Sequence, residues 1–510
     1  MSKTRWLKLG VLILLLIWFS LFIVRKPDFQ TVDLGRHLKN GEIFVTQPTE
    51  RHALLHTNFY SYTETNYPFI NHHWGFGVIV YLLWLVVGFK GLTFFYLALL
   101  MGALLLFFDV ARRYAGLWVA VASLFATLPI IAYRIEIRPE GVTYFFAALF
   151  FWILWRYTRE NISAKFLWLL PVVMLLWVNI HIGFIFGFAV LAIFLADECI
   201  DSTKRRDDKI RNISIALVIS GIAGLVNPSF ISGLLYPFKI FSNYGYLVFE
   251  NQSILYLQKL GFNPTIFLLY EIVVVVAWLS FIVAWLVGKK PTVAIFLSTL
   301  MATVLSATAI RNLPFMGLFG MVALAINGHD ILRISVFKKI LIPIYCVAAL
   351  ALFNIGVQNI IDSRSILGPG IMPNVQRPAD FLKNNNISGP IFSDYDVGAY
   401  MIYNFFPKER VFVDNRPEAY PTNFFRDTYI PVQLDLSRWA ELSEKYKFNV
   451  IFFNRNEQSQ WAQNFINFRI NDPQWAVVYS DPQVLIYLRR TAENQAFIQT
   501  HEIHFGGDNS

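Results

Sequence analysis

The stretch FLWLLPVVMLLWVNIHIGFIFGFAVLAIFLA, residues 166–196, decides the fold because it contains no Asp, Glu, Lys or Arg. A straight helix needs about 20 apolar residues to cross a membrane, and this stretch is longer. The polar break Asn179-Ile180-His181-Ile182-Gly183 divides it. Arg159 and Lys165 precede the stretch, and Lys204-Arg205-Arg206 follow it. Since basic loops stay in the cytoplasm, the stretch predicts a transmembrane hairpin whose polar tip lies on the opposite side.

The rest of the chain has a similar composition. Of its 510 residues, 56% are hydrophobic and 15% are charged, whereas soluble proteins carry about 25% charged residues. The formal net charge is +9, but Lys and Arg gather in short loops between apolar runs, which excludes nucleic acid as the expected partner. Cys199 and Cys346 lie in or beside apolar runs and indicate neither a disulfide framework nor a metal motif. The composition predicts a polytopic α-helical membrane protein.

The first apolar run follows basic residues and has no small-residue cleavage site after it. We therefore expect an uncleaved first span with a cytoplasmic N-terminus. Further runs of the same kind predict the other membrane-embedded segments. The runs lie at 8–24, 75–89, 91–110, 115–133, 141–155, 166–178, 182–197, 213–228, 265–287, 291–307, 314–327 and 338–356.

The charge of the connectors indicates the side of the membrane on which each one lies. Basic connectors alternate with connectors of another kind, at 133–140, 177–183, 228–264 and 309–314. These would lie outside the cytoplasm together with loop 26–74. Because Arg112-Arg113 are inside, the run 75–88 must lie in the outer leaflet or re-enter. We expect about eleven crossings plus this re-entrant or interfacial helix. The C-terminus would then be periplasmic or extracellular, with the protein in the cell (inner) membrane of a bacterium.

Loop 26–74 is too long for a simple connector and is rich in aromatic residues and histidine. Within it, VDLGRHLKNGEIF predicts an amphipathic helix at the membrane surface, with Leu34, Leu38 and Phe44 facing lipid. FYSYT predicts a short extended piece. We expect the loop to be folded.

From about residue 357 the composition changes, and Gly368-Pro369-Gly370 marks a linker. We expect a transmembrane domain at 1–356 that includes loop 26–74, an external α/β domain at 357–490 and a flexible tail at 491–510. Asp414 and Arg416 favour a structural ion pair or turn cap over a site. The predicted strands are GPIFSDYD, RVFVDNRPEAY, FNVIFFNRN and WAVVYSDPQVLIYLRR, and the predicted helices are RPADFLKNN and DLSRWAELSEKYK.

Polar residues from separate connectors meet on the predicted external side. Ionisable groups at membrane depth are costly and therefore indicate function. Since all of them end at one face, we expect one pocket. The set is Asp33, Arg36, His37, His72, His73, Arg134, Glu136, Arg138, Glu140, Asn179, His181, Asn227, Arg311 and Asn312.

Asp33 has two interpretations. A carboxylate just after the first span can act as a general base toward a hydroxyl, and Asp also suits the N-cap of a helix over 34–44. Arg134, Arg138 and Arg311 can bind a phosphate or diphosphate through paired hydrogen bonds. The alternative for these arginines is interfacial anchoring, or pairing of Arg138 with Glu136 or Glu140.

The histidines are unevenly distributed. Five of the nine lie in the first loop, and His181 adds a sixth on the same predicted side. A metal site is one interpretation, but no ligand spacing identifies one, and surface or hydrogen-bonded histidine is the alternative. A divalent cation is therefore not indicated, and the cofactor stays open. The five in the loop are His37, His52, His56, His72 and His73.

The order of short motifs resembles a bacterial subgroup of the membrane-embedded glycosyltransferase C superfamily. That superfamily includes protein mannosyltransferases, aminoarabinose transferases and oligosaccharyltransferases. The resemblance spans most of the chain. It rests on an acid after the first span, then GRHLKNGE, FYSYT, INHHWGF, RPE, LLWVNIHIGF, RNLP and, near the C-terminus, GAYMIY and VFVDNRPEAY.

The resemblance implies inverting transfer of a sugar from a polyprenyl-phosphate-linked donor to an extracytoplasmic lipid, glycan or protein. Asp33 would serve as base, and Arg138 or Arg311 would hold the lipid phosphate. Members often have a second acid beside the first, where this chain has Leu34-Gly35-Arg36, and the subgroup often has an acid at the position of His73. The other substrate-binding candidates are Arg36, His37, His72, His73, Arg134, Glu140, Asn179 and His181.

Other functions fit a polytopic protein. A transporter or flippase would need polar groups near the midplane, broken helices and internal repeats, and we find no clear repeat. A lipid-linked glycan polymerase or ligase would carry its arginines in large late loops. A non-catalytic scaffold of the cell envelope is a further alternative. The sequence identifies neither the sugar, the acceptor nor the oligomeric state.

Overall fold

A computed structural model describes residues 3–200, 207–239 and 243–505. The predicted basic connector Lys204-Arg205-Arg206 and the last five residues lie outside the described residues. The chain forms two compact units. The first combines Met1–Lys26, Phe89–Pro237 and Val248–Gly370, and the second combines Pro27–Gly88, Phe238–Leu247 and Ile371–Ser510.

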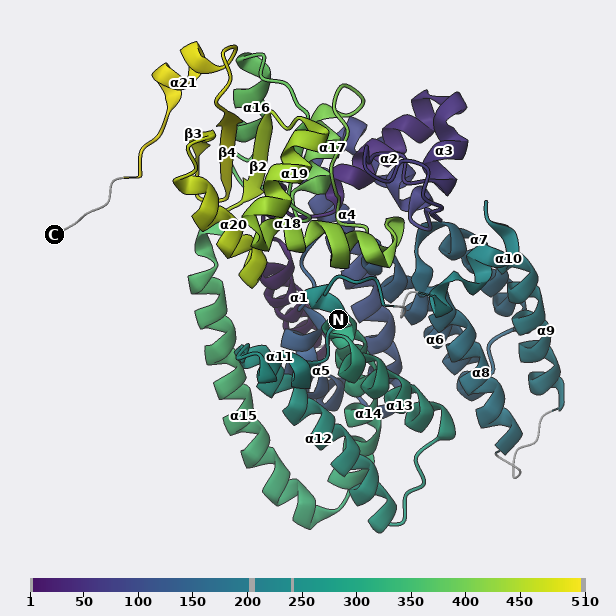
Figure 1. Ribbon diagram of the computed structural model, residues 1–510. Helices are drawn as coiled ribbons and strands as arrows, with labels where there is room; N and C mark the ends of the chain where they lie inside the picture. Colours follow the sequence, from purple (N-terminus) through teal and green to yellow (C-terminus); the bar gives the residue numbers. More distant parts are fainter. Residues whose placement is uncertain (1–2, 201–206, 240–242, 506–510) are drawn as a thin grey trace. The chain divides into compact units, whose positions relative to one another are not determined.

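The first unit is helical (Figure 1), and each predicted apolar run of this unit falls on a helix. Long apolar stretches satisfy their backbone polar groups internally only as helices. The helices are α1 (Lys3–Ile23), the second part of α4 (Trp74–Ala115), α5 (Leu117–Ile131), α6 (Glu140–Glu160), α7 (Leu169–Ile180), α8 (Ile185–Ile200), α9 (Asp207–Gly224), α10 (Phe230–Leu235), α11 (Ile254–Lys259), α12 (Thr265–Leu286), α13 (Val293–Thr308), α14 (Leu313–Leu332) and α15 (Ser335–Asp362).

Within the described residues, six helices are long and apolar enough to cross a membrane. Three shorter apolar helices, Leu117–Ile131, Ala164–Ile180 and Val293–Thr308, accompany them. Length and composition alone do not place a bilayer, so the figure of about eleven crossings stays a prediction. The six are Trp6–Ile23, Trp74–Ala115, Ile182–Ile200, Thr265–Leu286, Ile310–Leu332 and Ser335–Asp362.

Helix α4 is interrupted at Gly88, whose φ of 61° and ψ of −168° are not helical. A positive φ of this kind is readily adopted only by glycine. The break separates 74–87, which belong to the second unit, from 89–115, which belong to the first. The sequence-based separation of 75–88 from 91–110 falls at the same place.

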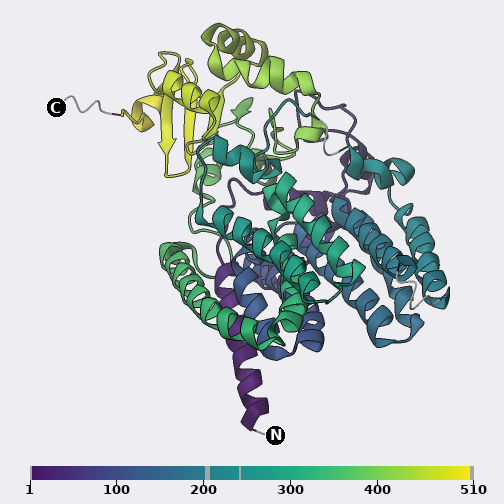
Figure 2. The ribbon, with the colours of Figure 1, turned by 90° about the horizontal axis from the view of Figure 1, so that it is seen from below.

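Close helix packing in the first unit depends on small residues, as is usual between membrane helices. A Cβ added at Gly317 of α14 would lie 2.6 Å from the side chain of Ile131 on α5. Gly356 of α15 lies equally close to Trp18 of α1, which stacks on Phe353 at 5.0 Å. Figure 2 shows α15 beside α1.

The second unit contains a four-stranded sheet, as the sequence predicted for its C-terminal part. The strands are β1 (Ile391–Ser393), β2 (Val450–Asn454), β3 (Trp475–Ser480) and β4 (Val484–Arg489), in the order β1-β2-β4-β3. β1 and β2 are parallel, and the other neighbours are antiparallel. The helices of this part are α16 (Arg377–Asn384), α17 (Gly398–Phe405), α18 (Pro431–Leu434), α19 (Leu436–Tyr446), α20 (Gln460–Ile470) and α21 (Gln495–His501).

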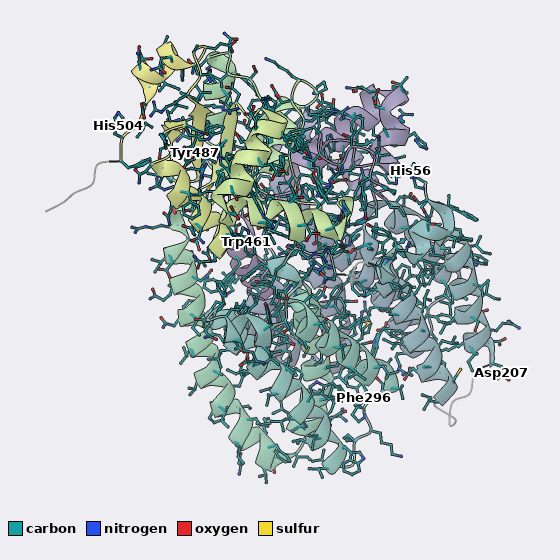
Figure 3. All side chains as sticks on the ribbon, in the orientation of Figure 1. His56, Asp207, Phe296, Trp461, Tyr487 and His504 are labelled. Atoms are coloured by element: carbon teal, nitrogen blue, oxygen red, sulfur yellow. The ribbon has the colours of Figure 1, made fainter. Side chains whose placement is uncertain are left out.

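The core of the second unit is aromatic. Tyr487, labelled in Figure 3, is fully buried in β4. Tyr246 packs on Tyr395 with ring centroids 4.3 Å apart and lies 6.2 Å from Trp461. Burial of large rings contributes strongly to folding. The segment Phe238–Leu247 therefore belongs to this unit although it lies far from the other parts in sequence.

Three predictions for this unit were wrong in part. RVFVDNRPEAY forms no regular strand, since Val411 makes only an isolated bridge to Ser61. FYSYT is mostly turn and bend, because the bridge from Ser61 to Val411 is isolated. Side-chain hydrogen bonds replace the strand ladder there. The predicted flexible tail contains α21, and Ile503 after it donates its N–H to the carbonyl of Val477 in β3.

The first loop contains α2 (Leu34–Thr46), η1 (Pro48–Glu50) and α3 (Arg51–His56), so the predicted helix is confirmed. Its predicted contact with lipid was wrong for Leu34 and Leu38, which are each 1% exposed, whereas Phe44 is partly exposed. A Cβ at Gly35 would lie 2.7 Å from the carbonyl of Ala399 in α17. The apolar face of α2 packs on protein. We predicted this loop as part of the 1–356 domain, and it packs with the C-terminal segment.

Acidic side chains lie at the carboxyl ends of the parallel strands β1 and β2. Asp394 accepts hydrogen bonds from the backbone N–H of Val397, at 3.0 Å, and of Asn454. Burial raises the pKa of Asp394 to about 7. Burial and a hydrogen bond with Glu457 also raise the pKa of Asp396. A proton is therefore held more tightly here in the folded than in the unfolded state.

We expect the free energy of unfolding of the second unit to fall as pH rises from 4 to 8. The contribution of Asp394 is fully present below its unfolded pKa of about 3.9 and is lost as pH rises through about 7, an effect on the order of 4 kcal/mol. Trp439 and Trp475 report unfolding by fluorescence. In Asp394→Asn this pH slope should flatten, and an unchanged slope would contradict the assignment.

Candidate functional site

The predicted site residues divide between the two units. Asp33, Arg36, His37, His72 and His73 belong to the second unit. Arg134, Arg138, Glu140, Asn179, His181 and Arg311 belong to the first. Each group is described by itself, and the single pocket stays a prediction.

Glu250 joins two of the predicted arginines in the first unit. Its Oε2 accepts a hydrogen bond of 2.9 Å from Nη2 of Arg134. Nη1 of Arg138 lies 3.1 Å from Oε1 and 2.9 Å from Oε2 of the same carboxylate. Both arginines come from the connector between α5 and α6, and Glu250 lies in the short helix η6 (Phe249–Asn251). One carboxylate thus occupies two guanidinium groups.

Two more carboxylates surround this arginine pair. Glu136 Oε2 lies 2.5 Å from Nε of Arg138, and Glu140 Oε1 lies 3.6 Å from Nη2 of Arg134. Of the two partners that the sequence offered for Arg138, Glu136 and Glu140, it pairs with Glu136, whereas Glu140 pairs with Arg134. Burial alone would raise the pKa of Glu250, but the charges of Arg138 and Arg134 hold this pKa well below its usual range. Glu250 is therefore ionised.

Arg311 lies in η7 (Ile310–Asn312), which begins close to the Glu250 turn. The N–H of Ile310 donates to the carbonyl of Gln252 at 3.0 Å. The hydroxyl of Tyr144 in α6 donates to the carbonyl of Arg311 at 2.9 Å. The charge of Arg311 also contributes to the lowered pKa of Glu250. The structure thus brings Arg311 to the same cluster as Arg134 and Arg138.

His181 lies at the break of the predicted hairpin, between α7 and α8. The indole of Trp177 donates to the hydroxyl of Thr143 at 2.9 Å, and this hydroxyl lies 2.6 Å from Nδ1 of His181. The N–H of Gly183 donates to the same Nδ1 at 3.1 Å. Because an N–H can only donate, Nδ1 accepts, and the ring proton is assigned to Nε2. The orientation of His181 is therefore fixed by three neighbours.

Asn179 binds two backbone carbonyl groups. Its amide donates to the carbonyl of Leu175 at 2.9 Å and to that of Val226 at 2.8 Å. These bonds hold the end of α7 to the segment after α9. The bond to Val226 satisfies a carbonyl just beyond the end of α9.

The sequence-based set missed Glu250, Thr143 and Trp177. Glu250 is the sole acidic residue of the predicted external loop 228–264, which was a usable signal. Thr143 and Trp177 lie on apolar helices, where a hydroxyl or an indole is indistinguishable from ordinary core. Their contacts with His181 exist only in the folded chain.

In the second unit, Asp33 is positioned by Arg36. Nη2 of Arg36 lies 3.2 Å from Oδ1 of Asp33, and Nε of Arg36 donates to Oδ1 of Asn415 at 3.4 Å. Asp33 occupies the N-cap position of α2, yet its side chain makes no capping hydrogen bond. Asp33 thus stands at the predicted N-cap position, but its carboxylate pairs with Arg36.

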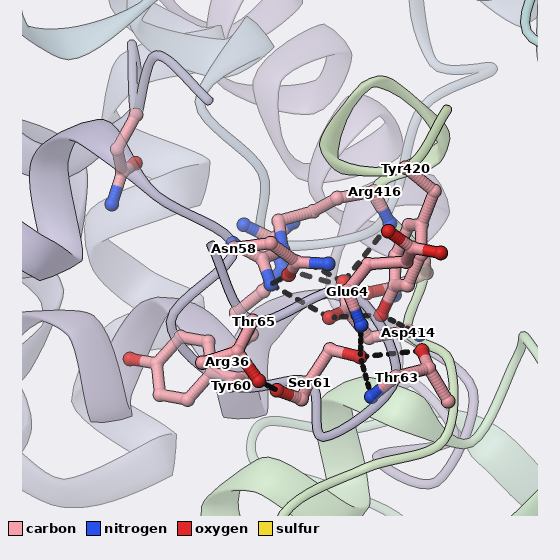
Figure 4. A network of polar contacts seen from close by, with 12 residues as sticks. Arg36, Asn58, Tyr60, Ser61, Thr63, Glu64, Thr65, Asp414, Arg416 and Tyr420 are labelled. Carbon is pink, nitrogen blue, oxygen red and sulfur yellow. Dashed lines mark hydrogen bonds and ion pairs between the residues drawn. The ribbon is translucent and has the colours of Figure 1, made fainter. Parts of the chain in front are cut away.

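Figure 4 shows the polar network around Asp414 and Arg416. Asp414 and Arg416 form a bidentate pair with both distances at 2.7 Å, and both side chains are buried. Arg416 also donates to Oδ1 of Asn58 at 2.8 Å, and the hydroxyl of Tyr420 donates to Asp414 at 3.1 Å. The predicted structural ion pair is confirmed. It fastens the first loop to the C-terminal part of the same unit.

Three histidines gather beside α2. The ring centroids of His72 and His73 lie 3.9 Å apart, and those of His37 and His73 lie 5.5 Å apart. Nδ1 of His72 lies 3.1 Å from the carbonyl of Ile70. Across the described ranges, no group of three His, Cys, Asp or Glu side chains has the geometry to hold a metal ion.

No protein-family model matches the chain, and no curated protein matches it in sequence. Solved structures match its fold. The archaeal oligosaccharyltransferase AglB from Archaeoglobus fulgidus, in complex with an inhibitory peptide and a dolichol-phosphate, has a TM-score of 0.57 at 11% identity, over 96% of this chain and 75% of that chain.

ArnT from Cupriavidus metallidurans in the apo state has a TM-score of 0.54 at 13% identity, over 96% of this chain and 98% of that chain. The same protein bound to undecaprenyl phosphate has a TM-score of 0.52 at 12% identity, over 95% and 98% of the two chains. AglB and ArnT are glycosyltransferases of the C superfamily. This chain therefore shares its fold with AglB and ArnT, which supports the resemblance of its motifs to the glycosyltransferase C superfamily.

Proposed function

We propose that the protein transfers a sugar from a polyprenyl-phosphate-linked donor to an acceptor on the external side of a bacterial inner membrane. The single observation that carries this proposal is the arginine pair Arg134 and Arg138, which binds one carboxylate, that of Glu250, beside the ends of apolar helices. The fold supports it, because its relatives include an oligosaccharyltransferase bound to a dolichol-phosphate and ArnT bound to undecaprenyl phosphate.

Arg134 and Arg138 would hold the phosphate of the donor, with Arg311 as a third cation. Guanidinium groups bind phosphate through paired charged hydrogen bonds, in the way that they bind a carboxylate. The connector between α5 and α6 lies next to apolar helices, where a lipid-linked phosphate can reach it from the bilayer. His181, with its proton on Nε2, would donate a hydrogen bond to the same ligand.

Asp33 would act as the general base. An acceptor hydroxyl attacks the anomeric carbon of the sugar while its proton passes to the Asp33 carboxylate. The bond between the anomeric carbon and the phosphate oxygen breaks, and polyprenyl phosphate leaves. Attack opposite the leaving group inverts the anomeric centre. Nη2 of Arg36 lies 3.2 Å from Oδ1 of Asp33 and would hold the carboxylate in place for this step.

The direct test is transfer of a radiolabelled sugar from a polyprenyl-phosphate donor by the purified protein in detergent or vesicles. Formation of labelled acceptor and free polyprenyl phosphate in equal amounts is the expected result. Movement of the intact labelled donor between vesicle leaflets without any transfer would instead support a flippase.

We expect residues 33 and 181 to lie on the same, external side of the membrane. A phosphatase that folds only outside the cytoplasm should therefore be active when fused after Asp33 or after His181. Fusion after Asn161, in a connector predicted to be cytoplasmic, is the matched control and should be inactive. Activity at only one of the two external positions would place Asp33 and His181 on opposite sides of the membrane and contradict a shared site.

A further inference from the structure

Glu250 holds the position that the proposed function gives to the donor phosphate. Its two oxygens receive hydrogen bonds from both Arg134 and Arg138, at 2.9 to 3.1 Å. A phosphate would use two oxygens and the same guanidinium N–H groups. The two anions cannot occupy these donors together, so the ligand can bind there only where the carboxylate withdraws.

The charges of the cluster are balanced while Glu250 is in place. Arg134, Arg138 and Arg311 supply three positive charges, and three carboxylates surround them. A polyprenyl phosphodiester carries one negative charge. Exchange of this diester for Glu250 keeps the balance, whereas its addition beside Glu250 would leave an excess anion in a partly buried site, which is costly.

Glu250 is better placed to move than its partners. It lies in a three-residue helical turn of a long loop, with 21% of its side chain exposed. Arg134 is 11% exposed, and the hydroxyl of Tyr96 on α4 binds its carbonyl at 3.4 Å. A short turn can shift at lower cost than a segment bonded to a packed helix.

We propose that Glu250 occupies the donor-phosphate site on the Arg134–Arg138 pair when no donor is bound. One phosphate group of the donor then displaces the carboxylate of Glu250. The inference rests on the proposed function, since it takes this pair as the phosphate site. The carboxylate keeps the arginines paired when no donor is bound. It also competes with every anion that enters, so weakly binding anions do not occupy the site.

Binding of farnesyl methyl phosphate, a singly charged phosphodiester, tests the exchange in the full-length protein by calorimetry. Glu250→Gln should lower the Kd by about tenfold or more, because the competing charge is gone. Glu136→Gln is the matched control, since it removes one charge from the same cluster and leaves Glu250 in place. It should lower the Kd by less than about threefold.

An unchanged Kd in Glu250→Gln, or equal gains in the two variants, would overturn the exchange. Arg138→Gln distinguishes this failure from failure of the proposed function. If Arg138→Gln loses binding and Glu250→Gln gains none, only the proposed exchange is contradicted. If Arg138→Gln binds the probe as the wild type does, the proposed phosphate site is contradicted as well.

A measurement on the wild-type protein covers the case in which Glu250→Gln fails to fold. Hydrogen exchange of residues 248–251 should become faster when the probe binds, because the turn loses its bonds to both arginines. Exchange of α12 should stay the same and serves as the internal control. Equal or slower exchange at 248–251 with saturating probe would overturn the proposal.

Discussion

Replacing Asp33 with Asn is expected to lower the rate of sugar transfer by about 10²- to 10⁴-fold, the contribution of a positioned general base. The carboxylate lies 3.2 Å from Arg36, so its position is fixed by a neighbour that the variant retains. An amide of the same shape cannot accept the acceptor proton. We therefore expect kcat to fall while the KM for the donor changes little. Radiolabel transfer at saturating donor measures this effect.

Asp427→Asn is the control for this variant. Asp427 is a carboxylate of the same unit, 53% exposed and paired with Arg426, and it should be replaceable without loss of transfer. Asp33→Glu keeps a carboxylate one methylene away and should retain part of the rate. A thermal midpoint near that of the wild type separates lost chemistry from unfolding. Equal turnover by wild type and Asp33→Asn would remove Asp33 from the mechanism.

Apolar composition predicted the helices of the first unit because a membrane leaves the backbone few alternatives. The hairpin at 166–196 illustrates this, since α7 ends at Ile180 and α8 begins at Ile185. Gly88 also interrupts α4 where the sequence separated two runs. A short polar run or a glycine is therefore enough to predict where such a helix breaks.

The same reasoning could not identify the partner of an apolar face. Leu34 and Leu38 form a face that would suit lipid, and in the structure it packs on protein, including α17. Lipid and protein interiors are equally apolar, so hydropathy does not distinguish them. The strand predicted in RVFVDNRPEAY failed for a related reason. Its backbone N–H groups at Arg416 and Asp414 bind the side chains of Asp414 and Tyr420 rather than a neighbouring strand.

Of the candidate site, the sequence indicated the ionisable residues and not their pairing. Arg134 and Arg138 were identified from a connector, but Glu250 lies more than a hundred residues away and was missed. Such a pairing depends on how α5, α6 and the long loop fold together, and no local periodicity reports it. The motif RPE contributed Arg138 and Glu140 to one cluster without showing which acid each arginine would bind.

The double variant Arg134→Gln and Arg138→Gln is expected to lower kcat/KM for the donor by about 10²- to 10⁴-fold. Each charged hydrogen-bond partner contributes about 1.5–3 kcal/mol, and two are lost. The effect should appear mainly in the KM for the donor, because Asp33 still accepts the acceptor proton. Single Arg→Lys replacements keep the charge but lose the paired geometry, so they should fall between the double variant and the wild type.

The double variant can lose transfer because it unfolds as well as because it no longer binds the donor. Replacing Glu250 separates the two effects. Removal of both arginines leaves the carboxylate of Glu250 partly buried without its two strongest partners, which destabilises the fold by about 3–5 kcal/mol if it stays charged. Adding Glu250→Gln removes that charge and should restore the thermal midpoint. The triple variant should still be unable to bind the donor phosphate. Recovery of both stability and transfer in the triple variant would mean that the arginines hold Glu250 and no phosphate.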